Sequence, residues 1–224
     1  MDSLTPATST MTSLSRPPRD ITSGLVSSRT GFEAVLNEMI RAPRVYCDTE
    51  TSQLGNYKSK ERARASAIWD SRVYATGIGI GWKIDGIRNE FYLPWRHDVP
   101  DKHNLPKLWL PEFKEIFETK EIVVHNYLYD HPSLLTLGIT IPEDNYWDTM
   151  VMAHMVNEEF PAKQLDWLAK FVLKDDGKDK EQLNQFLKAM TWQEVPPQIM
   201  APYCCKDVNL TGRLWEVFIR ELKP

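Results

Sequence analysis

Hydrophobic positions along residues 31–94 follow patterns that predict one helix and then three strands. The residues at helical spacing are Phe32, Val35, Leu36, Met39 and Ile40, and the helix that they predict over residues 31–40 ends before Pro43. An apolar run at residues 45–47 predicts a buried strand. Alternation over residues 73–82 and 87–94, with Asp85-Gly86 between them, predicts a β-hairpin.

The pattern over the rest of the chain is helical, with one more strand. Phe113, Ile116 and Phe117 predict a short helix, and Ile122-Val123-Val124 predicts a buried strand of the parallel type. Further helical patterns cover residues 147–156, 164–173, 181–190, 197–207 and 209–222. This order of elements predicts an α/β fold in which helices flank a mixed β-sheet.

The chain divides into a tail and a single domain. Residues 1–30 hold 13 Ser or Thr and few bulky side chains, so we predict a flexible Ser/Thr/Pro-rich tail over 1–30 and a folded domain over 31–224. Scattered arginines in the tail faintly resemble an organelle transit peptide, but Asp2 and Asp20 argue against one.

Composition narrows the class of protein. The 224 residues are 42% hydrophobic, enough to fill the core of one large domain. The net charge of −4 argues against a general polyanion binder, which is usually basic throughout. Three cysteines cannot form a disulfide framework, and no stretch approaches the roughly 20 apolar residues of a membrane span. We therefore expect an intracellular, cytoplasmic protein, or one of an organelle or host nucleoid, without a membrane partner.

Two carboxylates stand at the end of the first predicted strand, in the sequence Val45-Tyr46-Cys47-Asp48-Thr49-Glu50-Thr51. Alternate residues of a strand share a face, so Asp48 and Glu50 lie about 6 to 7 Å apart on one face while Thr49 points away. Their charges repel unless a divalent cation such as Mg²⁺ lies between them. The alternative is an exposed strand end with no ligand.

Two other pairs have helical spacing. Asn126 and Asp130 follow the strand at residues 122–124 and would share one face of the next helix. The alternative is that Asn126 caps that helix and Asp130 is a surface charge in its first turn. Tyr203 and Asp207 are also four residues apart, and the alternative for them is a solvated helix face.

Taken together, these motifs resemble the tyrosine subclass of the DEDD exonuclease superfamily, and most closely the 3′ to 5′ proofreading exonuclease domain of family A DNA polymerases. The matching segments are D-x-E-T at 48–51, N-x-x-Y-D at 126–130, residues 147–157, residues 165–173 and Y-x-x-x-D at 203–207. Pro202 occupies the position where the histidine subclass has its histidine. The resemblance implies a ribonuclease H-like fold.

The resemblance also implies a chemistry. The catalytic residues would be Asp48, Glu50, Asp130, Tyr203 and Asp207. The four carboxylates would hold two divalent cations, Mg²⁺ or Mn²⁺, and the Tyr203 hydroxyl would orient the attacking water. The implied activity is metal-dependent 3′ to 5′ hydrolysis of terminal phosphodiesters in single-stranded or frayed DNA, releasing nucleoside monophosphates during proofreading or DNA processing.

By the same resemblance, Leu54, His125, Asn126 and Tyr129 would wedge and hold the terminal nucleotides. Aromatic side chains stack on bases without reading sequence. His125 stands where the family often has glutamine, so a neutral packed histidine is the alternative for it. The basic residues of segment 57–66 could hold backbone phosphates, or form a solvated loop.

The expected partners are 3′-ended DNA and a separate DNA polymerase or replisome component. The chain ends shortly after Asp207, where a family A polymerase would continue. One alternative function is a ribonuclease D-like or Werner-like exonuclease that acts on RNA or on repair intermediates. Another is an inactive nucleic-acid-binding module of the same fold.

Overall fold

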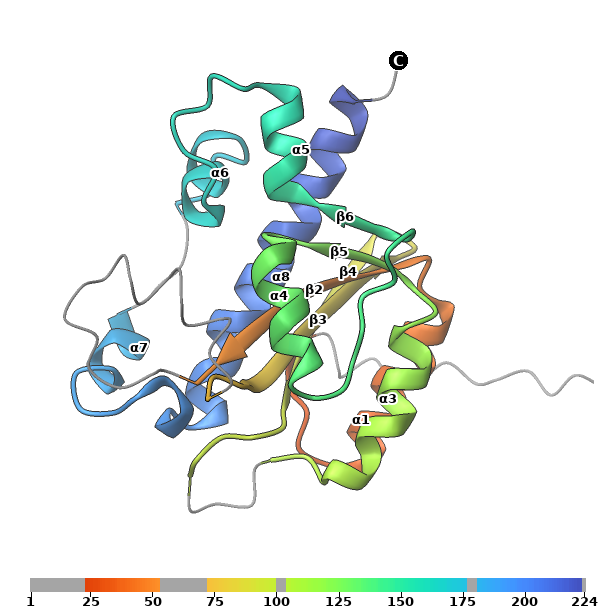
Figure 1. The fold of residues 1–224 in the computed structure, drawn as a ribbon, viewed down its shortest axis with the longest axis vertical. Helices are drawn as coiled ribbons and strands as arrows, with labels where there is room; N and C mark the ends of the chain where they lie inside the picture. The colour runs from red at the N-terminus through yellow and green to blue at the C-terminus, as the bar shows by residue number, and fades with distance from the viewer. Residues whose placement is uncertain (1–22, 53–71, 100–103, 177–180, 223–224) are drawn as a thin grey trace, which may run out of the picture.

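A six-stranded mixed β-sheet forms the centre of the computed structural model, which describes residues 23–52, 72–99, 104–176 and 181–222 (Figure 1). The strands are β1 Ser23–Leu25, β2 Arg44–Thr51, β3 Ala75–Ile84, β4 Ile87–Pro94, β5 Glu121–Val124 and β6 Tyr146–Asp148. Their order in the sheet is β1-β4-β3-β2-β5-β6. Strand β3 is antiparallel to β2 and β4, and the other neighbours are parallel. The predicted α/β fold with a mixed sheet is confirmed.

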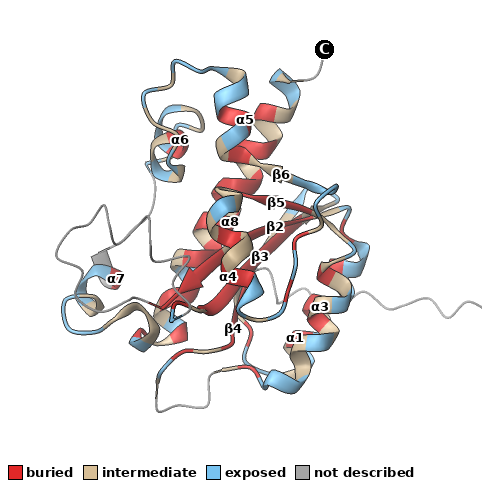
Figure 2. Ribbon diagram, in the orientation of Figure 1, coloured by how far each residue is buried: buried red, intermediate tan, exposed pale blue. Residues whose placement is uncertain are grey.

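Helices flank the sheet. They are α1 Arg29–Arg41, α3 Leu110–Phe117, α4 Tyr127–Leu135, α5 Thr149–Val156, α6 Leu165–Phe171, α7 Glu181–Phe186 and α8 Pro197–Glu221, with 3₁₀ turns at Lys107–Trp109 and Trp192–Glu194. Helix α8 packs on β1 to β5, while α1 and α3 share a hydrophobic core with the strands. The buried residues concentrate on the strands and on the sheet-facing sides of these helices (Figure 2). None of the described helices is both long and apolar enough to cross a membrane.

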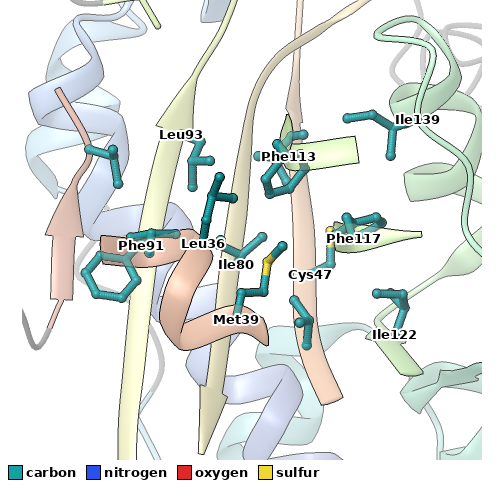
Figure 3. Close-up of a cluster of buried hydrophobic side chains, with 14 of the residues drawn as sticks. Leu36, Met39, Cys47, Ile80, Phe91, Leu93, Phe113, Phe117, Ile122 and Ile139 are labelled. Atoms are coloured by element: carbon teal, nitrogen blue, oxygen red, sulfur yellow. The ribbon is translucent and has the colours of Figure 1, made fainter. Parts of the chain in front are cut away.

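The two faces of β2 belong to different clusters. Val45 and Cys47 join the core beneath α1 and α3, where Cys47 and Ile80 lie with Met39 (Figure 3). Tyr46 belongs to the cluster under α8. Since side chains alternate along a strand, Asp48 and Glu50 continue the row that faces α8.

The β3–β4 hairpin forms as predicted. Its two-residue loop consists of Asp85 and Gly86, with φ of 51° and 81°. Both central residues of a type I′ turn need positive φ, which is why Asp-Gly suits this loop. The hairpin places β3 beside β2, so that Gly79 lies opposite Asp48.

Gly79 allows α8 to approach the sheet beside Asp48. A Cβ atom at this position would lie 2.5 Å from Cys204 Sγ and 2.7 Å from Val208 Cγ2. Both contacts are shorter than real Cβ contacts, so no larger residue fits without moving the helix. Gly79 thereby fixes how closely the residues of α8 approach the end of β2.

We expect Gly79→Ala to lower the free energy of unfolding by about 1 to 3 kcal/mol, because the added methyl group overpacks a filled contact. Urea unfolding measures this change. Gly31→Ala is the control, because a Cβ there lies within helix α1 at 3.2 Å from the movable Ser28 Oγ, and its effect should stay within about 1 kcal/mol. Equal stability of the two variants would show that α8 lies farther from β3.

The fold begins earlier than the expected boundary at residue 31. Strand β1 pairs with β4, placing Gly24 opposite Phe91, and the Ser28 hydroxyl accepts a hydrogen bond from Gly31 N at the start of α1. The polar composition of residues 23–30 hid this short strand. Residues 1–22 of the expected tail lie outside the described residues.

Three other details of the prediction were wrong. Trp147 belongs to β6 and α5 begins at Thr149, because a three-residue strand carries too little periodicity to be recognised. The expected helices at 197–207 and 209–222 are one helix, α8, continuous through the buried Val208. The expected helix at 181–190 ends at Phe186.

Candidate active site

Asp48 and Glu50 occupy the carboxyl end of β2, on the face that α8 covers. Glu50 is buried and Asp48 is half-buried. Their partners on β3 are Gly79 and Gly77, and the strand register shifts directly after Glu50. The Thr76 hydroxyl donates a hydrogen bond to the Glu50 carbonyl oxygen at 3.0 Å. The neighbouring strand thus fixes the backbone that carries both carboxylates.

The thiol of Cys204 also lies at this position. Cys204 Sγ on α8 donates to Asp48 Oδ2 at 3.6 Å. Within the described residues, Asp48, Glu50 and Cys204 form a group whose potential metal-ligating atoms all lie within 4.8 Å of one another. Burial first, and then the charges of Glu50 and Asp48, raise the pKa of the Cys204 thiol well above its ordinary value. The cluster therefore combines two carboxylates with a protonated thiol.

Asp130 reaches the cluster from α4. Its Oδ1 atom accepts hydrogen bonds from Thr49 N at 3.0 Å and from Thr49 Oγ1 at 2.8 Å. Strand β5 pairs with β2 only as far as Tyr46. Beyond that residue, the Asp130 carboxylate accepts the hydrogen bond from the Thr49 backbone N–H, on the side of β2 where the neighbouring strand has ended. The side chain of Thr49 points away from Asp48, as predicted, and its role is to hold Asp130.

The second oxygen of Asp130 is placed as a cation ligand would be. Asp130 is 1% exposed, and among the described residues Oδ2 has no hydrogen-bond partner. Burial, followed by the charge of Asp48, raises the pKa of Asp130 well above its ordinary value. A bound divalent cation would reverse both effects, because it stabilises the charged form and supplies the missing partner. The buried oxygen donors thus fit a hard divalent cation.

Asp148, at the end of β6, positions the start of α4. Its Oδ1 accepts from Asn126 N at 3.0 Å and from Met150 N at 2.8 Å, and its Oδ2 accepts from Tyr127 N at 2.8 Å. One carboxylate therefore satisfies the first N–H groups of both α4 and α5, at helix ends where negative charge is favourable. Asp148 is not among the site residues predicted from the sequence.

We expect Asp148→Ala to lower the free energy of unfolding by about 1 to 3 kcal/mol, because it leaves backbone N–H groups of two helices without acceptors. Any activity that depends on the position of Asp130 should fall with it, since α4 carries Asp130. Asp148→Asn keeps the oxygen that serves Asn126 and Met150 and should lose less stability. Thermal unfolding measures both variants, and an alanine variant as stable as the asparagine variant would contradict this role.

Helix α8 supplies Asp207 and Tyr203. Asp207 is 5% exposed, and Tyr203 is half-buried with its ring 6.1 Å from that of Trp192. Burial, then the charges of Asp207, Glu50 and Asp48 in that order, raise the pKa of Tyr203 above its ordinary value. The Tyr203 hydroxyl therefore lies in the field of several carboxylates and stays protonated at neutral pH.

Two of the expected substrate-binding residues, His125 before α4 and Tyr129 on α4, take part in contacts within the protein. His125 Nδ1 lies 2.8 Å from Thr149 Oγ1, which itself donates to Val124 O, so the histidine nitrogen is the donor. The Tyr129 hydroxyl bonds to Thr51 Oγ1, and burial raises its pKa to about 12. Leu54 and the basic segment 57–66 lie outside the described residues.

Asn126 adopts a left-handed conformation, with φ of 81° and ψ of 69°. Its side chain makes no capping hydrogen bond, so the alternative interpretation as a side-chain cap is wrong, and Asp148 has that role. Asparagine tolerates positive φ better than most residues. The sharp turn at Asn126 carries the chain from β5 directly into α4.

A mixed sheet with acidic residues at the end of its central strand and on two flanking helices defines the class: a ribonuclease H-like α/β protein of the DEDD exonuclease superfamily. A family model described as 3′-5′ exonuclease, that of family A DNA polymerases, matches residues 25–223. The chain therefore belongs to this 3′-5′ exonuclease family, whose superfamily uses divalent metals.

Similar proteins include both DNA polymerases and ribonucleases. DNA polymerase I of Borreliella burgdorferi is 24% identical over 201 residues, which are 88% of this chain and 20% of the polymerase. The chain thus spans about a fifth of the length of that relative.

Two solved structures are similar in fold. RNase D of Trypanosoma brucei in complex with GMP aligns with a TM-score of 0.62 and 10% identity, covering 89% of this chain and 58% of that one. Escherichia coli RNase D, an exoribonuclease involved in structured RNA processing, aligns with a TM-score of 0.60 and 14% identity, covering 88% and 44%. At this identity the likeness shows the fold alone.

Proposed function

We propose that this protein is a metal-dependent exonuclease that removes nucleoside monophosphates from the 3′ end of single-stranded or frayed DNA. The observation that carries the proposal is the buried carboxylate of Asp130, anchored through one oxygen and destabilised in its charged form by burial and by Asp48. Such an arrangement costs free energy unless a cation binds there. Family membership supports the same activity.

In this proposal Asp48, Glu50, Asp130 and Asp207 would hold two divalent cations, Mg²⁺ or Mn²⁺. Oxygen-only ligands suit both ions. Cations at such a site lower the pKa of water and neutralise charge on the entering and leaving oxygens of a phosphoryl displacement. Thr49 and Asp148 act as positioning residues, since they hold Asp130 and the helix that carries it.

Tyr203 would orient the attacking water. Its hydroxyl stays protonated because burial and nearby carboxylates raise its pKa, so it serves through a hydrogen bond and does not remove a proton from water. Leu54, His125, Asn126 and Tyr129 would hold the terminal nucleotides. For Tyr129, the bond to Thr51 leaves the ring, rather than the hydroxyl, for contact with a base.

The test uses 5′-labelled DNA and RNA strands of one sequence, incubated with the protein in Mg²⁺, in Mn²⁺ or in a chelator. We expect the labelled DNA strand to become shorter by one nucleotide at a time from its 3′ end, and only when a cation is present. Internal cleavage or shortening from the 5′ end would overturn the proposal. A strong preference for the RNA strand would support the ribonuclease D-like alternative instead.

We further propose that the protein acts inside the cell beside a DNA polymerase. The support is the family model and the polymerase relative, of which this chain matches about a fifth. A primer with a mispaired 3′ end, offered to a polymerase lacking its own exonuclease, should be extended only after this protein is added. Extension that is independent of the protein would contradict this role.

A further inference from the structure

Cys204 is in contact with the candidate metal ligands. It has no role in the proposed hydrolysis, in which carboxylate oxygens bind the cations. Its sulfur lies 3.6 Å from Asp48 Oδ2. The sulfur also lies within 4.8 Å of a carboxylate oxygen of Asp48 and of one of Glu50. The next residue, Cys205, belongs to a different environment, since it lines a surface cavity of about 610 Å³ with Gly24 and Glu90. Two adjacent cysteines therefore face different surroundings.

The backbone holds the Cys204 sulfur in place. Gly79 leaves the space that it occupies, because a Cβ there would lie 2.5 Å from Sγ. Cys204 is fully buried, and it sits on α8 one turn before Val208, which packs against the same strand. Gly79 thus leaves room for the sulfur beside the carboxylates, and the packing of Val208 holds the helix that carries it.

We propose that Cys204 determines which cation this site prefers, by adding a sulfur ligand to the oxygens of Asp48 and Glu50 when a thiophilic divalent ion, Zn²⁺, is bound. This inference deepens the proposed nuclease function and rests on it. Thiolate ligands select Zn²⁺, whereas carboxylates suit Mg²⁺ and Mn²⁺. The site would therefore bind Zn²⁺ in preference to the ions that suit hydrolysis.

A second observation points independently to a ligand at this position. Asp130, whose charge interacts with that of Asp48, is 1% exposed and keeps its buried Oδ2 without a hydrogen-bond partner among the described residues. Asp130 therefore adds a buried, unpartnered oxygen in the electrostatic neighbourhood of Asp48, beside the group formed by Asp48, Glu50 and Cys204. The two carboxylates and the sulfur of that group give three protein ligands, the number that Zn²⁺ takes where a water fills its fourth position.

Binding requires one proton to leave. The thiol releases its proton to water as the sulfur–zinc bond forms, and the S–H donation to Asp48 Oδ2 is lost at the same time. No oxidant or reductant takes part. Mg²⁺ gains little from sulfur and would leave the thiol protonated, so the two kinds of ion differ in how they use Cys204.

The test measures binding of cadmium chloride, a spectroscopic stand-in for Zn²⁺, to the metal-free protein without nucleic acid. We expect the near-ultraviolet absorption of a thiolate–cadmium bond in the native protein and in Cys205→Ser, and its loss in Cys204→Ser. Cadmium and zinc affinity should fall in Cys204→Ser by more than the roughly 10- to 100-fold that loss of an outer-shell partner costs. Magnesium affinity should change far less.

Two results would overturn the inference: absence of the absorption from the native protein, or its persistence in Cys204→Ser. Because Cys204 is buried, circular dichroism must show that the serine variant is folded, and Cys204→Ala provides a second variant with the same expected loss. The readout is separate from activity. Nuclease activity without thiolate binding would refute only this inference, while thiolate binding without nuclease activity would refute only the proposed function.

Discussion

Asp207→Asn is expected to reduce the turnover of 3′-ended DNA by at least about 1,000-fold. A cation that neutralises transition-state charge contributes several kcal/mol, and each 1.36 kcal/mol changes the rate tenfold. The substitution keeps the shape of a side chain that is 5% exposed while removing its charge. Single-turnover release of mononucleotides at saturating Mg²⁺ measures the loss, and urea unfolding should show that the variant remains folded.

The matched control is Glu216→Gln, which removes a carboxylate from the same helix. Glu216 pairs with Lys83 at 3.1 Å and with Arg88 at 2.7 Å, away from the acidic cluster. Its loss should cost some stability and leave turnover unchanged. If Asp207→Asn kept near-normal turnover, Asp207 would not be a metal ligand. Only three of the four proposed carboxylate ligands would then remain.

The sequence predicts the parts of this site that depend on local geometry. The alternation of β2 puts Asp48 and Glu50 on one face, and the spacing of four residues puts Tyr203 near Asp207 in a helix. In the structure, ligand atoms of Asp48 and Glu50 lie within 4.8 Å of each other, and burial followed by the charge of Asp207 raises the pKa of Tyr203. Their chemical roles remain proposals.

Contacts between distant segments could not be read from the sequence. Thr49 holds Asp130 across 81 positions, and Cys204 meets Asp48 across 156. Asp148 acts on backbone groups rather than on a side chain, so its partners could not be identified from residue types. In hindsight, the signal for Asp148 was its place before a helix, where an acidic residue often caps the first turn.

The missed elements have a similar explanation. Strands β1 and β6 have three residues each, too few for alternation to show, and they exist because they pair with longer neighbours. Strand β6 matters for the site, since its last residue, Asp148, orients α4. The prediction of a helix from Trp147 therefore missed the element that sets the position of Asp130.

Tyr203→Phe is expected to slow hydrolysis by about 10²-fold, because the attacking water loses the hydroxyl that orients it and misplacement of a reacting group costs about that factor. The phenylalanine ring keeps the contact with Trp192, so stability should change little. Because burial and the charge of Asp207 raise the pKa of Tyr203 above its ordinary value near 10, the hydroxyl is protonated throughout the neutral range. The variant should therefore be slowed by the same factor between about pH 6 and pH 9.

Tyr146→Phe is the control for Tyr203→Phe, because Tyr146 lies at the surface on β6 and its ring stacks on Tyr127 at 4.3 Å. Its turnover should match that of the native protein. A Tyr203→Phe defect that disappears at low pH and grows as pH rises would mean that the phenolate acts as a base, against the direction of its pKa. Unchanged turnover at every pH would remove Tyr203 from the mechanism, leaving the water to be oriented by the carboxylates alone.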